Sequence, residues 1–331
     1  MSRDFLNGLL AKIGKIEYAE VLRASSEREN DERVLAEITW ATYTIQNPEM
    51  RIRNRIHEKY SFLENGLIVD ESDKWYGDPS VYDIFSEAED PENICFNVIM
   101  NELRNRKVDI VNPIDLATGT GRMLKQIIKN KTYKGIAFAV DANERMVAYT
   151  ERMVLRQHFY VHRINVCKGR IDSFVLPDGM KSTFIISSFG FPSRITDKDL
   201  CKRELENVYD LLEDDGIFAT IGWDETFNDE LNVMWYKHVP DKIVANNFED
   251  WRRRRVAQIT SPRNSKLSWF KKGLSIPLIF SSLSESAFVM GQLFGRDAVA
   301  DIVRQSKTTW KMSLGITLNT KNEIEKILTT L

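Results

Sequence analysis

Two glycines and an aspartate have the spacing of a nucleoside-binding site. Gly119 and Gly121 flank Thr120 in a turn of small residues, and Asp141 follows about twenty residues later. Glycine lets the backbone turn sharply and lets a ligand approach the amide groups. The amides at the start of a helix attract polar or negative groups, and a carboxylate after the next strand accepts hydrogen bonds from ribose hydroxyls. These residues therefore indicate a site for a nucleoside-containing cofactor.

The elements around these residues alternate between strand and helix patterns. An apolar run over 108–116 predicts a buried strand before the turn, and a helical pattern begins at Arg122. Further strands are predicted over 135–140, 159–166, 184–190 and 217–221, and a helix over about 197–212. This alternation predicts an α/β fold with a doubly wound, mostly parallel sheet. Ligands of such sheets bind beyond the carboxyl ends of the strands.

The type of cofactor depends on the residues around the two glycines. In the dinucleotide fingerprint Gly-x-Gly-x-x-Gly, a third glycine permits close packing of helix and strand, but Leu124 occupies that position. The spacing instead resembles the first motif of class I S-adenosylmethionine (SAM) methyltransferases, an acid followed by small-x-Gly-x-Gly, with Asp115, Ala117, Gly119 and Gly121 in those places. A nicotinamide cofactor and an ordinary glycine-rich turn are the alternatives.

The resemblance covers about residues 110–223 and implies a seven-stranded-type sheet that binds SAM and releases S-adenosylhomocysteine. It extends to an upstream Tyr-Asp pair at Tyr82 and to the segment 168–174, where the family contacts adenine. Many members have an acid directly after the glycine of that segment, and this chain has Arg170 there. The cofactor-binding residues that it implies are Tyr82, Asp115, Ala117, Thr118, Gly119, Gly121, Asp141, Ala142, Arg170, Ile171, Asp172 and Ser188.

Methyl transfer from a sulfonium is an in-line displacement, so the protein mainly positions the two reactants. A base is needed only where the acceptor must lose a proton. His238 can serve as that base, since imidazole titrates near neutral pH, or it is a surface histidine. Asp224 and Glu225 can hold a cationic amine, or they open a lid. The expected acceptor-binding residues are Phe189, Phe191, Trp223 and Tyr236.

The remaining chain suggests additions to the sheet. Residues 1–107 are mainly helical and predict an N-terminal cap, with a polar loop over 70–91. Residues 108–223 form the core, 224–305 a lid inserted after the fifth strand, and 306–331 a strand and a helix that complete the core. Long additions beside a binding site are usually functional. A sheet of this type needs a second closing strand, whose origin the sequence leaves open; one candidate is the region 267–283, where two strand-like runs suggest a hairpin.

The composition and net charge of the chain exclude some classes of function. The chain has 331 residues, of which 43% are hydrophobic, and a net charge of −2, so no global attraction to nucleic acid or membrane is expected. Three cysteines and four histidines lack metal-ligand spacing, and the sparse cysteines fit a reducing compartment. No signal peptide or membrane-spanning run is found. We expect a cytoplasmic protein without a metal, and a homodimer stays open.

The first hypothesis is a SAM-dependent methyltransferase acting on nitrogen or oxygen of a small molecule or short peptide. An RNA or protein methyltransferase that docks through the basic run from Arg252 to Arg255 is the alternative. Four consecutive helical side chains point in different directions, so a solvated helix explains this run too. A nicotinamide-dependent oxidoreductase and a non-catalytic binding relative are the remaining alternatives.

Overall fold

The computed structural model describes residues 38, 42, 45, 46, 79–130, 133–157, 163–190, 198–223, 229–231, 270–294 and 296–330. The chain divides into two compact units. The first comprises Met1–Ala88, Glu230–Asp241 and Leu278–Trp310, and the second comprises Glu89–Asp229, Lys242–Pro277 and Lys311–Leu331. Most of the predicted cap over 1–107 and of the predicted lid over 224–305 lies outside the described residues, so these boundaries stay predictions.

The second unit contains an alternating series of strands and helices. In chain order these are α7 (Ile94–Asn105), β1 (Ile114–Leu116), α8 (Arg122–Asn130), β2 (Ala137–Asp141), α9 (Glu144–Gln157), β3 (Ile164–Lys168), the 3-10 helix η3 (Pro177–Gly179), β4 (Ser182–Ser188), α10 (Lys198–Leu211), β5 (Leu212–Trp223) and α15 (Lys321–Thr330). Two further strands, β6 (Phe270–Ile279) and β7 (Thr309–Thr320), have residues in both units.

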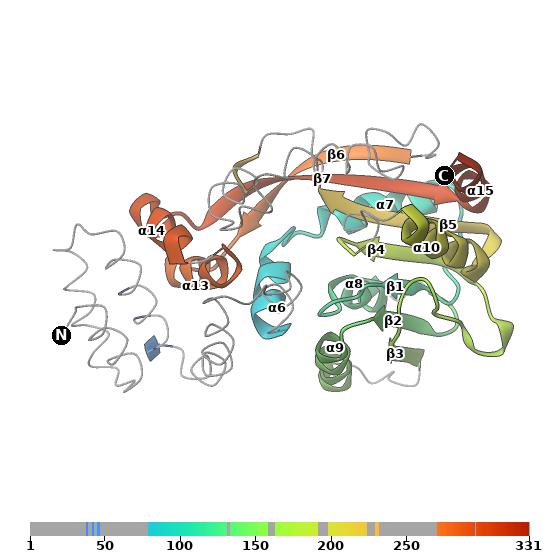
Figure 1. Ribbon diagram of the computed structural model, residues 1–331, viewed down its shortest axis with the longest axis horizontal. Coiled ribbons are helices and arrows are strands. Elements are labelled where there is room, and N and C mark those ends of the chain that lie inside the picture. Colours follow the sequence, from blue (N-terminus) through green and yellow to red (C-terminus); the bar gives the residue numbers. More distant parts are fainter. Residues whose placement is uncertain are drawn as a thin grey trace. The chain divides into compact units, whose positions relative to one another are not determined.

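The strands form one seven-stranded sheet in the order β3-β2-β1-β4-β5-β7-β6 (Figure 1). The neighbours from β3 to β5 are parallel, and β7 is antiparallel to β5. The predicted α/β class with a doubly wound, mostly parallel sheet is confirmed. One closing strand does come from the 267–283 region, but it is the single strand β6, so the predicted hairpin is wrong.

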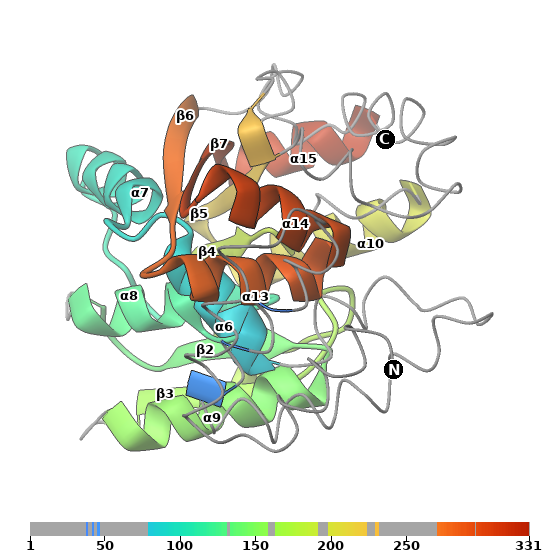
Figure 2. The same cartoon turned by 90° about the vertical axis from the view of Figure 1, so that its left-hand side faces the viewer.

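Helices cover both faces of the central strands, because alternate residues of each strand point to opposite sides. Phe138 and Val140 of β2 pack in a cluster with Leu205 and Val208 of α10 and with Ile324 of α15. On the other face, small residues of β2 meet larger ones of α8 and α9; this cluster contains Ala137, Ala139, Leu124, Ile128, Met153 and Val154. Figure 2 shows α8 on one side of the strands and α10 and α15 on the other.

The first unit contains a helix that the sequence analysis assigned to a loop. α6 spans Pro79–Ala88, so the loop predicted over 70–91 is wrong for these residues. A proline at the first helical position does not break a helix, since its missing N–H is unbonded there in any case. Val81, Phe85 and Ala88 follow at helical spacing and are buried. Within the same unit α13 (Leu283–Phe294) packs against α6 and against α14 (Arg296–Gln305).

A buried carboxylate caps the start of α7. Asp90 is 2% exposed, and its two oxygens accept hydrogen bonds from the amides of Ile94 (2.7 Å) and Cys95 (2.8 Å). These amides have no partner within the helix, so the cap satisfies two buried donors. We expect Asp90→Ala to lower the free energy of unfolding by about 2 kcal/mol, measured by chemical denaturation. Asp214→Ala, at a fully exposed carboxylate, should change it little, and equal effects would contradict the capping role.

Among the described residues, no helix is both long enough and apolar enough to cross a membrane.

Candidate cofactor site

The turn after β1 is stabilised by hydrogen bonds to the side chain of Asp115. This side chain is 1% exposed, and its Oδ2 accepts hydrogen bonds from the Thr118 hydroxyl (2.7 Å) and the Leu124 amide (3.0 Å). Burial raises the pKa of Asp115 to about 7, and the negative charge of Asp141 adds to this increase. The bond from Thr118 holds the turn, and the bond from Leu124 holds the first residues of α8. Asp115 therefore shapes the turn through its hydrogen bonds.

The turn itself uses backbone conformations that most residues avoid. Ala117, Gly119 and Gly121 have φ values of 55°, 57° and 82°, which for Ala117 means the left-handed region that L-residues rarely occupy. At Gly121 the φ of 82° would strain any other residue, and a Cβ there would lie 2.9 Å from the Met153 Cε atom. The Thr118 amide donates to the Val140 carbonyl at 3.0 Å. The turn is thereby fixed to the neighbouring strand β2.

Asp141 and the glycine turn form one bonded unit. The Gly119 amide donates to Asp141 Oδ2 at 2.8 Å, and the Asn143 amide donates to Oδ1 at 2.8 Å. On the other side of the turn, the Thr150 hydroxyl donates to the Gly119 carbonyl at 2.9 Å. A carboxylate has about four acceptor positions, so Asp141 can also accept ribose hydroxyls. The structure thus brings together the two parts of the predicted motif.

Two buried hydroxyl groups near the turn are consistent with a ligand. Thr120 Oγ1 and Ser187 Oγ are buried, and neither has a hydrogen-bond partner among the described residues. Thr120 belongs to the turn, and Ser187 lies beside Leu116 in the sheet. Buried hydroxyls are normally hydrogen-bonded, and an exception points to a water or a ligand. Together with the carboxylate of Asp141, these groups fit a polar nucleoside-type ligand.

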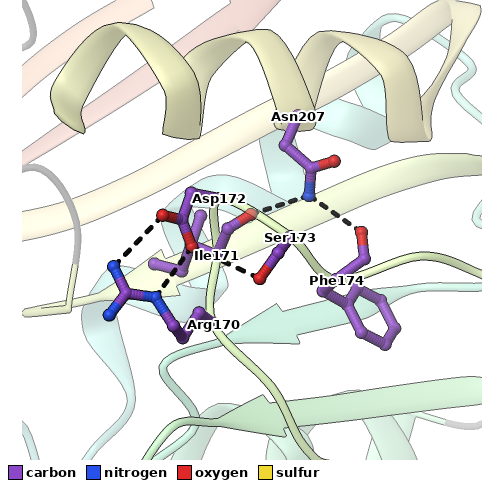
Figure 3. A network of polar contacts seen from close by, with 6 residues as sticks. All are labelled: Arg170, Ile171, Asp172, Ser173, Phe174 and Asn207. Carbon is purple, nitrogen blue, oxygen red and sulfur yellow. Dashed lines mark hydrogen bonds and ion pairs between the residues drawn. The ribbon is translucent and has the colours of Figure 1, made fainter. Parts of the chain in front are cut away.

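The segment after β3 is held together by an ion pair and by α10. Arg170 and Asp172 form two hydrogen bonds of 3.0 and 3.1 Å, and the Asn207 amide donates to the carbonyls of Ile171 (2.7 Å) and Phe174 (2.9 Å) (Figure 3). The hydrogen bonds from Arg170 hold the pKa of Asp172 below its usual value. Arg170, which stands where many members of the family have an acid, is thus paired with Asp172. Ala142, in contrast, is exposed directly after β2.

The end of β4 approaches the glycine turn closely. Phe189 has a φ of 60°, and its amide donates to the Ile221 carbonyl at 2.8 Å. A Cβ on Gly190 would lie only 2.1 Å from the Cβ of Ala117. Glycine is therefore the residue that fits here, because any side chain at 190 would collide with the turn. Of the predicted acceptor residues, Phe189 is thus placed beside the cofactor turn.

The sequence analysis missed a buried ion pair beside the turn. Arg122, the first residue of α8, contacts the Glu89 carboxylate at 3.1 Å and donates to the Glu89 carbonyl at 2.8 Å. It also donates to the Ser188 hydroxyl at 3.1 Å and lies 5.9 Å from the centre of the Phe189 ring. Burial raises the pKa of Glu89 to about 7. Arg122 directly follows the glycine motif, but nothing in the sequence marks Glu89 as its partner.

The other predicted site residues fall into three groups. Tyr82 lies half-buried on α6 of the first unit, so its contact to a cofactor stays a prediction. Trp223 ends β5, where its backbone pairs with Leu314 of β7. Outside the described residues lie Phe191, Asp224, Glu225, Tyr236, His238 and the run from Arg252 to Arg255. Within the described part of the chain, no group of His, Cys, Asp and Glu can hold a metal ion.

Comparisons with known proteins give matches to solved structures. The chain is similar to a SAM-dependent methyltransferase from Clostridium acetobutylicum (19% identity, TM-score 0.34, 51% of this chain and 58% of that one). Another SAM-dependent methyltransferase, from Aquifex aeolicus, matches at 22% identity (TM-score 0.35, 46% and 77%). The YcgJ protein of Bacillus subtilis matches at 13% identity (TM-score 0.40, 66% and 97%). No family model and no curated protein sequence matches the chain.

These similarities are limited in extent, and the match to the Clostridium acetobutylicum enzyme spans little more than half of its length. The strand order of the sheet identifies the fold more clearly than these similarities do. The order β3-β2-β1-β4-β5-β7-β6, with β7 antiparallel to β5, is the strand order of class I methyltransferases. The glycine turn and Asp141 stand at the carboxyl ends of β1 and β2. The protein therefore has the fold of class I SAM-dependent methyltransferases.

Proposed function

We propose that the protein is a SAM-dependent methyltransferase that acts on nitrogen or oxygen of a small molecule or short peptide. The observation that carries the proposal is the hydrogen bond of 2.8 Å between the Gly119 amide and the Asp141 carboxylate. It joins the turn that admits the cofactor to the acid that accepts its ribose hydroxyls. Asp115 supports the same turn through the Thr118 hydroxyl and the Leu124 amide.

Two features argue against a nicotinamide cofactor. Leu124 stands where the dinucleotide fingerprint has its third glycine, and it is fully buried in a cluster with Ala137 and Ala139 of β2. The small alanines leave room for the leucine, so α8 packs on β2 through a side chain instead of through a glycine. The second feature is the antiparallel strand β7 beside β5, whereas the dinucleotide fold continues in parallel with strand order 3-2-1-4-5-6.

The proposed chemistry is mainly one of positioning. When bound, SAM supplies an activated methyl group, whose bond to sulfur breaks as the bond to the acceptor atom forms. Asp141 and the turn hold the donor in place, and the end of β4 with Phe189 faces the acceptor. An acceptor that must lose a proton passes it to a base, for which we propose His238, while Asp224 and Glu225 orient a cationic acceptor. Phe191, Trp223 and Tyr236 complete the proposed acceptor site.

The test is isothermal titration with S-adenosylhomocysteine, with NADH as the competing ligand. We expect S-adenosylhomocysteine to bind and Asp141→Ala to weaken this binding about 100-fold, because two charge-assisted hydrogen bonds are lost. Asp214→Ala, which removes a fully exposed carboxylate of the same unit, should leave the affinity unchanged. Binding of NADH alone, or equal affinity for the wild type and Asp141→Ala, would overturn the proposal.

A further inference from the structure

We propose that Arg122 is a positioning residue that couples the occupied cofactor turn to the acceptor end of β4. This inference rests on the proposed function and adds a role for a residue outside the motif itself. The Arg122 side chain connects the proposed cofactor-binding turn with the end of β4, which we propose to contact the acceptor. Its own backbone directly follows Gly121 of the turn, and its guanidinium reaches Ser188 and Phe189 at the end of β4.

The guanidinium of Arg122 is held in one orientation. Residue 122 is 8% exposed, and its two terminal nitrogens bind three oxygen atoms: the Glu89 carbonyl (2.8 Å), the Glu89 carboxylate (3.1 Å) and the Ser188 hydroxyl (3.1 Å). A planar guanidinium donates in fixed directions, and a buried ion pair is costly to break because it leaves a charge without compensation. Movement of the turn at Gly121 therefore moves Ser188 and Glu89 with it.

The end of β4 contains the element that can respond. Phe189 has a φ of 60°, in the left-handed region, which a non-glycine residue keeps only where its surroundings impose it. The surroundings here are the Arg122 guanidinium near the ring and the Ile221 carbonyl that accepts the Phe189 amide proton at 2.8 Å. Phe189 is thus held in a strained conformation beside Arg122. Coupling between the two sites requires that Phe189 also reach a relaxed conformation when the turn moves.

Glu89 provides two of the three oxygen atoms that hold the Arg122 guanidinium in place. It is 3% exposed and lies at the start of the second unit, next to Asp90 that caps α7. Removing the arginine alone would leave this carboxylate buried without its cation, which would destabilise the fold. The test therefore uses the paired change Glu89→Gln with Arg122→Gln, which removes both charges and leaves a polar side chain at each position.

The experiment measures amide hydrogen exchange over residues 186–190 with and without S-adenosylhomocysteine. In the wild type we expect the ligand to slow exchange at the Phe189 amide by at least about fivefold, the lower end of typical coupling between sites. In the paired variant the ligand should still bind, measured by titration, but this protection should be lost. Arg163→Gln is the matched control, since Arg163 also stacks on a ring, that of Tyr133, at 5.1 Å and donates to a backbone carbonyl, that of Gly135.

The outcomes separate the inference from the function on which it rests. Ligand-dependent protection that persists in the paired variant would overturn the role of Arg122 and leave the proposed function standing. Loss of protection in Arg163→Gln as well would also overturn it, since the effect would then not be specific to Arg122. If S-adenosylhomocysteine fails to bind the wild type, the proposed function itself is wrong. A merely structural arginine would lower the unfolding free energy without changing the ligand-dependent difference.

Discussion

Gly190→Ala is expected to abolish cofactor binding and to lower the free energy of unfolding by about 3 kcal/mol, as overpacking of a dense contact does. The added Cβ would stand 2.1 Å from the Cβ of Ala117, well inside the contact distance of two methyl groups. Neither side can yield easily, because Ala117 belongs to the turn that Asp115 and Val140 hold in place. Chemical denaturation and titration with S-adenosylhomocysteine measure the two effects.

A second substitution distinguishes this collision from a general loss of backbone freedom. Ala117→Gly removes the opposing Cβ, and a glycine suits the φ of 55° at position 117. The double variant should therefore recover most of the stability and binding that Gly190→Ala loses. Gly222→Ala is the control in the same sheet, since a Cβ at 222 meets no heavy atom within 4 Å. Failure of Ala117→Gly to restore binding would show that the contact is not the cause.

Asp115→Ala should cost about 3 kcal/mol, because it leaves the Thr118 hydroxyl and the Leu124 amide without their acceptor. Asp115→Asn should cost much less near pH 5, since one amide oxygen can replace the Oδ2 that accepts both bonds. The difference between the two variants measures the hydrogen bonds of the turn. Equal losses would mean that the amide oxygen of Asn does not replace the carboxyl acceptor, and would contradict the role of these two hydrogen bonds.

The raised pKa of Asp115 also predicts how the stability of the wild type, relative to Asp115→Asn, changes with pH. Burial raises the pKa of Asp115 from its ordinary value of 3.8 to about 7, so the folded protein binds a proton that the unfolded chain has released. This contribution is complete below the unfolded pKa and is lost as the pH rises through the folded one. From about pH 4 to 8, the wild type should lose stability relative to Asp115→Asn by on the order of 4 kcal/mol, since each unit of pKa difference corresponds to about 1.4 kcal/mol.

Comparison with the variant is essential, because other buried carboxyl groups titrate in the same range. Burial raises the pKa of Glu89 to about 7 and that of Glu204 to about 8. Their contributions are common to both proteins and cancel in the difference. Asp214→Asn, at a fully exposed carboxylate, should follow the wild type at every pH. A pH-independent difference between the wild type and Asp115→Asn would contradict the raised pKa.

Local patterns in the sequence predicted the part of the site that lies within one strand, turn and helix. The glycines at 119 and 121 had to sit in a turn, and their φ values of 57° and 82° agree. Asp141 was predicted to stand near that turn because parallel strands end at the same edge of a sheet. The hydrogen bond to the Gly119 amide shows how closely it does so.

Contacts between segments that are distant in the chain could not be predicted from the sequence. An arginine at the start of an amphipathic helix gives the same pattern whether it faces solvent or a buried acid, so the bond between Arg122 and Glu89 had no sequence signal. The helix α6 was hidden by Pro79 and by polar residues around its buried positions. Likewise, β5 extends over Leu212–Trp223, beyond the strand predicted over 217–221, because it continues through an irregularity of its pairing with β4.

The position of β7 affects the order in which the sheet can form during synthesis. Among the described strands, β7 is the neighbour of both β5 and β6, although it follows β6 in the chain. When β6 has left the ribosome, the strand that joins it to β5 is still inside. The edges of β5 and β6 therefore stay unpaired until β7 has been synthesised. Unpaired strand edges can pair with other chains and cause aggregation. A nascent chain stalled before residue 309 should thus be more dependent on chaperones than one stalled after α15.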